Sequence, residues 1–257
     1  MSGAPDPSSG AGGGPAAALG EAARTLRPPR GDRHGPLAPM MVALTVVTGV
    51  VDAVSYLKLG HVFVANMTGN IVFLGFAIAG ASGLSSASSL IAIGSFLLGA
   101  LVGGRLAQRT PEHRGRMLRT ATAVQAGLIM LALVLALSAT EPPGSAARHG
   151  LLIALALAMG VQNAAAQRLA IPELTTTVLT RTLTGLASEA RLVGGPGSQL
   201  GRRAVAVAAM LLGAFTGALL ALEVSIAAAL GVAGAVVVAV GLVVHVASRT
   251  DAAWAQA

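Results

Sequence analysis

The chain contains no cysteine among its 257 residues. This absence excludes disulfides, thiolate nucleophiles and cysteine-bound metal ions. Charged residues are also scarce, at 11% of the chain, whereas a soluble domain is about a quarter charged. Because 54% of the residues are hydrophobic and the mean hydropathy is +0.75, the composition predicts an integral membrane protein.

Aromatic residues are rare as well, at 3% of the chain, and most apolar residues are Ala, Val, Leu or Gly. Small side chains of this kind favour closely packed membrane helices. The net charge of +7 comes from arginines that cluster between the apolar runs. That distribution follows the positive-inside rule. We therefore expect the lipid bilayer as a partner and no nucleic acid.

Eight apolar segments approach the roughly 20 residues that a membrane helix needs. They cover residues 38–57, 62–80, 88–107, 118–139, 149–170, 174–190, 203–222 and 225–247.

Loop charges reduce the number of crossings. Five arginines lie within residues 105–119, where the third segment ends and the fourth begins, and the loop at 80–89 carries no charge. Because arginine-rich loops stay on the cytoplasmic side, the regions 38–80 and 149–190 must each cross the membrane once, through one interrupted or re-entrant helix. The predicted fold is all-α, a polytopic transmembrane bundle with about six net crossings and two interrupted helices. A tail on the outer side would instead allow seven spans.

The organisation that follows has three parts. Residues 1–37 are rich in Gly, Pro and Ala and carry several arginines, so we expect a disordered basic tail. Residues 38–247 form the transmembrane domain, and residues 248–257 form a short C-terminal tail. Both termini are expected on the cytoplasmic side of a bacterial plasma membrane, and association with further copies of the chain stays open.

Short matches indicate an internal repeat with halves at about 38–139 and 149–247. Residues 49–53 (GVVDA) match residues 160–164 (GVQNA), and residues 96–104 match residues 210–218. Residues 67–69 lie opposite residues 179–181. The near-constant offset favours duplication. Since each half makes an odd number of crossings, the two halves are predicted to be inverted repeats, whose interrupted helices meet at a binding site.

The first interrupted region carries one polar stripe at helical spacing. Its members are Thr45, Thr48, Gly49, Asp52, Ser55 and Tyr56. Charged groups at membrane depth often mark function, so Asp52 is a candidate proton or cation site, or an acceptor for a substrate hydrogen bond. The alternative is a structural charge pair, with Lys58, Arg168 or Arg181, or a helix cap beside a break.

A second set of polar residues follows in Asn66, Thr68 and Asn70. Asparagine both donates and accepts hydrogen bonds, so it suits a polar solute or an exposed backbone at a helix break. Hydrogen bonds between helices are the alternative.

The second half offers Asn163, Gln167 and Thr180. Asn163 is the repeat equivalent of Asp52, so the two would form a pseudo-symmetric pair with one titratable member. Pro172 and the run Thr175–Thr177 mark the second break, where threonine hydroxyls can satisfy freed backbone groups. The pairs Gly99/Gly103 and Gly213/Gly217 are interpreted as helix-packing positions.

Catalytic and metal motifs do not support an enzyme. The five histidines are scattered without the spacing of metal ligands, and no hydrolase elbow or nucleotide-binding loop occurs. We expect no catalytic residue, no metal and no cofactor.

The run 48–56 (TGVVDAVSY) followed by 62–70 (VFVANMTGN) closely resembles the YoaK-like family of bacterial membrane proteins. Residues 160–164 and 175–180 look like it too. The resemblance covers about residues 40–247 and implies a multi-pass inner-membrane protein. It brings no established substrate or reaction.

The functional expectation is a secondary permease for a small polar solute, proton-coupled through Asp52. The alternative is a non-transporting membrane scaffold or sensor, in which the polar stripes hold the helices together.

Overall fold

The computed structural model describes residues 15–29, 36–109, 113–170, 179–188 and 199–248, and within them it holds nine helices and no strand. The helices are α1 (Pro15–Leu26), α2 (Leu37–Lys58), α3 (Met67–Ile78), α4 (Ser86–Gln108), α5 (Arg114–Ser138), α6 (Ser145–Leu169), α7 (Leu179–Ser188), α8 (Leu200–Glu223) and α9 (Ile226–Ala247).

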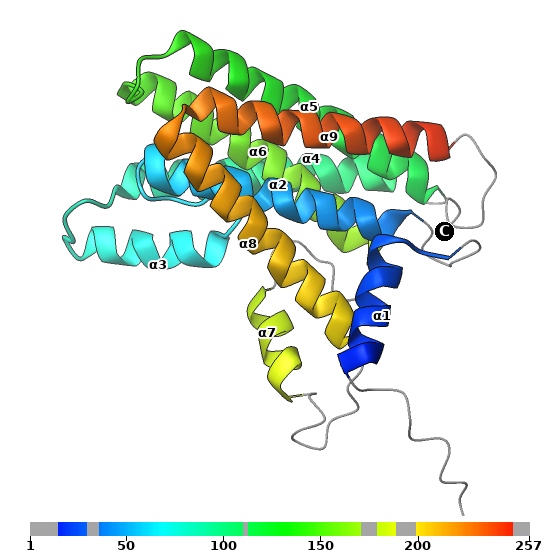
Figure 1. Cartoon of the computed structure of the whole chain (residues 1–257). Coiled ribbons are helices and arrows are strands. Elements are labelled where there is room, and N and C mark those ends of the chain that lie inside the picture. The colour runs from blue at the N-terminus through cyan, green and yellow to red at the C-terminus, as the bar shows by residue number, and fades with distance from the viewer. Residues whose placement is uncertain (1–14, 30–35, 110–112, 171–178, 189–198, 249–257) are drawn as a thin grey trace, which may run out of the picture.

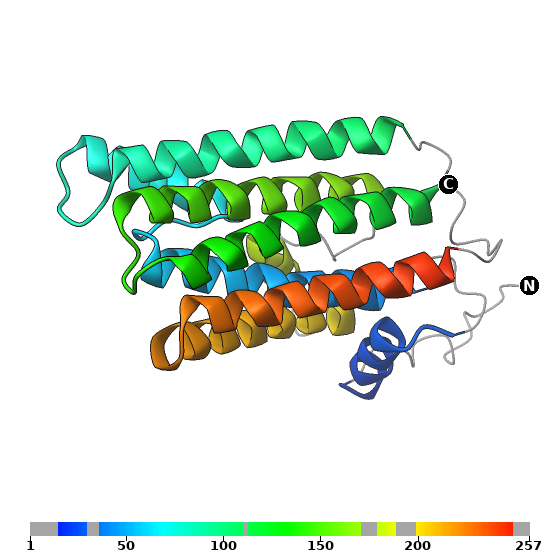
Figure 2. The same cartoon turned by 90° about the horizontal axis from the view of Figure 1, so that it is seen from above.

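Six of these helices are long and apolar enough to cross a membrane, namely α2, α4, α5, α6, α8 and α9. They lie side by side as one bundle (Figures 1 and 2). The predicted all-helical, polytopic bundle is confirmed. The segments expected at 62–80 and 174–190 form the short helices α3 and α7, with 12 and 10 residues. At 1.5 Å per residue, α3 is about 18 Å long, which is too short to cross the hydrocarbon core.

The first residue of α2 and the last residue of α9 lie at the same end of the bundle (Figure 2). The connection between α4 and α5, which contains Arg109, lies at this end too. The connections from α3 to α4 and from α8 to α9 lie at the other end. An even number of spans therefore separates the two ends of the helical domain.

The expectation of a disordered tail is wrong for residues 15–26, which form α1. Helix α1 lies across the bundle axis (Figure 1) and packs against the beginning of α8. Glu21 Oε2 accepts a hydrogen bond of 3.0 Å from the Gly201 amide. Because α8 has no side-chain cap of its own, α1 supplies an acceptor for its first turn. The composition of residues 1–37 does not reveal the contact between α1 and α8. Once α1 packs against α8, its alanines favour a helix.

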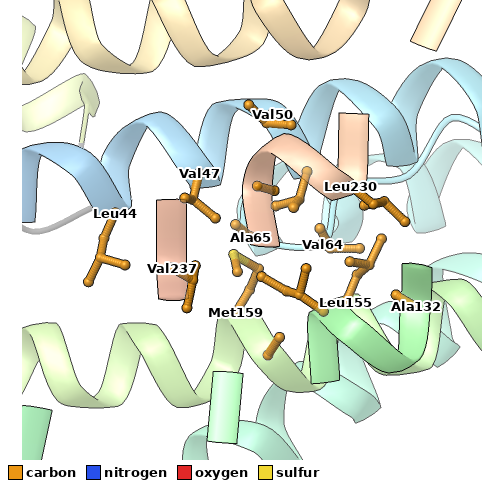
Figure 3. Packing of buried hydrophobic residues seen from close by; sticks show 14 of the residues in the cluster. Leu44, Val47, Val50, Val64, Ala65, Ala132, Leu155, Met159, Leu230 and Val237 are labelled. Atoms are coloured by element: carbon orange, nitrogen blue, oxygen red, sulfur yellow. The ribbon is translucent and has the colours of Figure 1, made fainter. Parts of the chain in front are cut away.

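The hydrophobic core includes part of the connection between α2 and α3. Figure 3 shows Val64 and Ala65 among side chains of the surrounding helices, including Leu155, Met159 and Leu230. Both connection residues are almost completely buried. Backbone between two helices therefore lies inside the bundle instead of crossing its surface.

The most extensive helix pairs are α4 with α6 and α2 with α8. Glycines bring both pairs into backbone contact. A Cβ on Gly160 of α6 would overlap Phe96 and Ala100 of α4, and a Cβ on Gly49 of α2 would overlap the backbone at 210 and 214 in α8. Gly99, Gly103, Gly213 and Gly217 make the reciprocal contacts. Their predicted role in packing is confirmed.

Substitution of Gly160 tests this contact. We expect Gly160→Ala to lower the free energy of unfolding by about 1–3 kcal/mol, since the added methyl group forces the α4 and α6 backbones apart. Gly231→Ala on α9 is the matched control, because nothing lies within 4 Å of its added Cβ. It should be neutral or stabilising by up to about 1 kcal/mol through helix propensity. Denaturant titration in detergent micelles measures both, and equal effects would contradict the close approach.

Candidate functional site

The connection between α2 and α3, residues 59–66, turns back into the bundle as soon as α2 ends. Gly60 has φ +107° and His61 has φ +57°, so both residues adopt left-handed conformations that reverse the chain. Val62, Val64 and Ala65 are then buried in the core. The connection is therefore a re-entrant linker, which passes through the core at residues 62–65 before α3 begins.

Asp52 holds this linker in place. Its Oδ1 atom accepts hydrogen bonds from the amides of Val64, at 2.9 Å, and Ala65, at 2.8 Å. Asp52 lies six residues before Lys58, the last residue of α2, so the linker reaches about 9 Å back along that helix. A buried amide without an acceptor is costly in a membrane. The carboxylate therefore stabilises extended backbone at this depth.

Asn70 fixes the same linker from α3. Its Oδ1 accepts from the amide of Phe63 at 2.8 Å, and its Nδ2 donates to the carbonyl of Phe63 at 2.6 Å. One side chain thus satisfies both backbone groups of a residue outside any helix. Asn66 occupies the N-cap of α3, where its side chain accepts from the Gly69 amide at 3.5 Å.

Aromatic side chains pack around the turn of the linker. The Tyr56 ring lies 5.0 Å from the ring of Phe63 and 5.4 Å from that of His61. Phe73 of α3 closes the group at 5.8 Å from Phe63. Ser55 is buried beside them and donates to the Asp52 carbonyl at 3.1 Å. Tyr56 and Ser55 therefore contact the linker and its anchor.

A cavity of about 900 Å³ lies where the C-terminal halves of α4 and α6 meet the first turn of α3. Its polar lining combines amides, hydroxyls and one guanidinium. These residues are Asn66, Thr68, Gln108, Asn163, Gln167, Arg168 and Thr180. The remaining lining is mostly alanine and glycine, together with Phe96 and Met67.

The predicted site residues therefore divide into two groups. Asn66, Thr68, Asn163, Gln167 and Thr180 line the cavity. Asp52, Ser55, Tyr56 and Asn70 are not among its lining residues. Asp52 and Asn70 bond the linker, Tyr56 stacks on it at Phe63, and Ser55 bonds within α2.

The structure shows which groups bond the side chain of Asp52. Both hydrogen bonds to its Oδ1 atom come from backbone amides of the linker, while Arg168 lines the cavity. Pro172 and Thr175–Thr177 lie outside the described residues, as does the side chain of Arg181.

The two members of the predicted Asp52/Asn163 pair have different surroundings. Asn163 lines the cavity, and its Nδ2 donates to the Met159 carbonyl of its own helix at 2.9 Å. Thr68 and Thr180, which correspond in the predicted repeat, both lie in the first turn of a short helix and both line the cavity.

Sequence reasoning missed a buried amide chain that joins three helices. Gln125 of α5 donates to Gln162 of α6 at 2.5 Å, and Gln162 donates to the Thr48 hydroxyl of α2 at 2.8 Å. All three side chains are buried. The available signal was Gln125, the one glutamine of the apolar helix α5, since an amide at membrane depth requires a partner.

Comparison with known proteins agrees with this architecture. Residues 40–243 match the family model described as "Protein of unknown function (DUF1275)". Over 151 residues the chain is 34% identical to the UPF0700 transmembrane protein YoaK of Bacillus subtilis (strain 168). That alignment covers 58% of this chain and 65% of the relative, so the chain spans slightly less than two thirds of that protein's length. No solved structure matches the chain.

The fold defines a multi-pass, all-helical membrane protein with a re-entrant linker beside a polar cavity. Within that class, the chain belongs to the DUF1275 family, to which the matched model assigns most of its helical domain. The predicted resemblance to YoaK-like proteins is confirmed.

Replacement of Asp52 tests the anchoring of the linker. Asp52→Ala leaves two buried amides without their acceptor, so we expect the free energy of unfolding to fall by about 2–4 kcal/mol. Asp52→Asn keeps a side-chain oxygen of the same shape and should lose clearly less. Denaturant titration in micelles compares the two variants with the unchanged chain. If alanine were tolerated as well as asparagine, the hydrogen bonds to Val64 and Ala65 would not stabilise the linker.

Proposed function

We propose that this chain is a secondary permease for a small polar solute, and not an enzyme. The observation that carries the proposal is the polar cavity that the first turn of α3, directly after the re-entrant linker, lines together with α4 and α6. Broken helices in transporters commonly supply binding groups of this kind near the middle of the membrane.

The shape of the cavity supports a solute path. Its lining on α4 begins at Phe96 and ends at Gln108, the last residue of that helix. Twelve residues of α-helix cover about 18 Å, roughly half of the membrane thickness. The walls are mostly small side chains, and amides and hydroxyls interrupt them at intervals. Such a lining gives a polar solute hydrogen-bonding partners without a deep apolar barrier.

The two most extensive helix pairs, α2 with α8 and α4 with α6, support the inverted repeat that we include in this proposal. Gly49 and Gly160 are 111 residues apart, and their contact residues Met210 and Phe96 are 114 apart. The first helix of each half therefore packs on the third helix of the other half through equivalent glycines. A pseudo-symmetric pair of units can move against each other and expose a site first to one side and then to the other.

Asp52 has a positioning role in this proposal, because its Oδ1 atom already accepts two amide hydrogens. Transport is coupled to protons if protonation of the Asp52 carboxylate loosens the linker and thereby changes the part of the cavity wall that the linker forms. The Asp52→Asn variant separates the two roles, since it removes the titratable group and keeps an acceptor.

A scaffold or sensor is the second candidate, and the chain of Gln125, Gln162 and Thr48 favours it. Hydrogen bonds of this kind hold membrane helices together without any solute. This candidate assigns no role to the cavity.

The orientation that we propose places the arginine-rich connection between α4 and α5 on the cytoplasmic side of a bacterial plasma membrane. The cavity then opens toward the cytoplasm, because Gln108 and Arg168 lie in the last turns of α4 and α6 at that end.

Cysteine labelling tests both the orientation and the re-entrant linker, since the chain has no cysteine of its own. We expect Arg109→Cys and Thr68→Cys to react with an impermeant maleimide in inside-out vesicles. Ser82→Cys, in the exposed connection between α3 and α4, should react in right-side-out vesicles. Labelling of Thr68→Cys from the same side as Ser82→Cys would contradict a cavity that opens toward α4 and α6.

Uptake into proteoliposomes tests transport itself, in a screen of small polar solutes with and without a pH gradient. For a solute that is taken up, Thr68→Val should lower uptake by about five- to ten-fold, the value of one lost hydrogen bond. Thr120→Val on α5 is the matched control, because its hydroxyl donates to its own helix and lies outside the cavity. Folded protein without uptake of any solute class would contradict the permease and favour the scaffold.

A further inference from the structure

We propose that the solute of this cavity is an anion, of the carboxylate or inorganic oxyanion class. This inference rests on the proposed permease function, because it names the substrate class of the same site.

The charge of the lining carries the inference. Arg168 is the one charged residue among the described residues that line the cavity, and no Asp or Glu occurs among them. The six other polar lining residues are neutral amides and hydroxyls, all of which can donate hydrogen bonds. A site for a cation would require acidic groups or converging carbonyls, whereas a guanidinium beside several neutral donors suits an anion.

Arg168 is not needed to complete the end of its own helix. The Leu169 carbonyl at the C-terminus of α6 accepts a hydrogen bond of 2.6 Å from Arg114 Nη2 of α5. A different arginine therefore already caps α6, and Arg168 extends beside the cavity one residue earlier. A guanidinium can bind a carboxylate or phosphate through two parallel hydrogen bonds, which gives direction as well as charge.

The inner end of the cavity is compatible with the same charge. Asn66, Met67 and Thr68 form the beginning of α3, and all three line the cavity. Peptide dipoles give the first turn of a helix a partial positive charge. The cavity thus has a full positive charge on its α6 wall and a favourable potential for anions where α3 begins.

Anion binding can be measured on the purified full-length protein by the thermal unfolding midpoint at constant ionic strength. Sodium salts of acetate, succinate, phosphate and sulfate are the anionic probes, glycerol and glucose are neutral probes, and choline chloride is the cationic probe. At least one anionic probe should raise the midpoint in a saturable way, while the neutral and cationic probes should not. Isothermal titration then gives the dissociation constant of that probe.

Arg168→Gln should weaken this binding by about ten-fold or more, because a charge-assisted contact is replaced by a neutral one. Arg105→Gln is the matched control, since Arg105 is an exposed arginine near the same end of α4 that does not line the cavity. It should leave the dissociation constant unchanged. The control also separates a bound anion from general electrostatic attraction to the arginine-rich end.

Several outcomes would overturn the inference. One is saturable binding of glycerol, glucose or choline without binding of any anion. A second is no stabilisation by any of the four anions. A third is an equal loss of binding in Arg168→Gln and Arg105→Gln. The permease can fail separately. Anion binding that depends on Arg168, without uptake of that anion, would support the binding site and contradict transport. Uptake of a neutral solute through the cavity would support transport and contradict the proposal that the solute is an anion.

Discussion

The carboxylate of Asp52 satisfies two backbone amides in a place where neither water nor a helix can do so. In the hydrocarbon region each unpaired backbone group costs several kcal/mol, so irregular backbone persists there only when side chains complete its hydrogen bonds. Asn70 meets the same requirement for Phe63 from the other side of the linker. The depth of the linker, the starting point of α3 and the inner end of the cavity all depend on these bonds.

Glycine contacts provide the frame around this linker. The pairs α2 with α8 and α4 with α6 approach until their backbones touch, because residues such as Gly49 and Gly160 have no side chain. Dispersion and close packing replace the hydrophobic driving force that lipid cannot supply. Within this frame, Asp52 of α2 holds the linker, while Asn163 of α6, its counterpart in the proposed repeat, lines the cavity.

Sequence reasoning succeeded where the signal was local. Loop charges and apolar length predicted six crossings and two short helices, because the cost of burying charge acts on each segment separately. It failed for α1, since the contact between Glu21 and Gly201 joins residues 180 positions apart. It also missed the amide chain of Gln125 and Gln162, because glutamines in different helices can be paired only after the helices are placed together.

The sequence by itself determined the class of protein and the family, and it favoured six spans. It also singled out nine polar residues for the site. Only the tertiary structure divided them, with five in the wall of a cavity and four around the re-entrant linker. The physical reason is that polar residues at membrane depth all carry the same signature in sequence. Whether such a group contacts backbone or open space depends on which segment folds back against it.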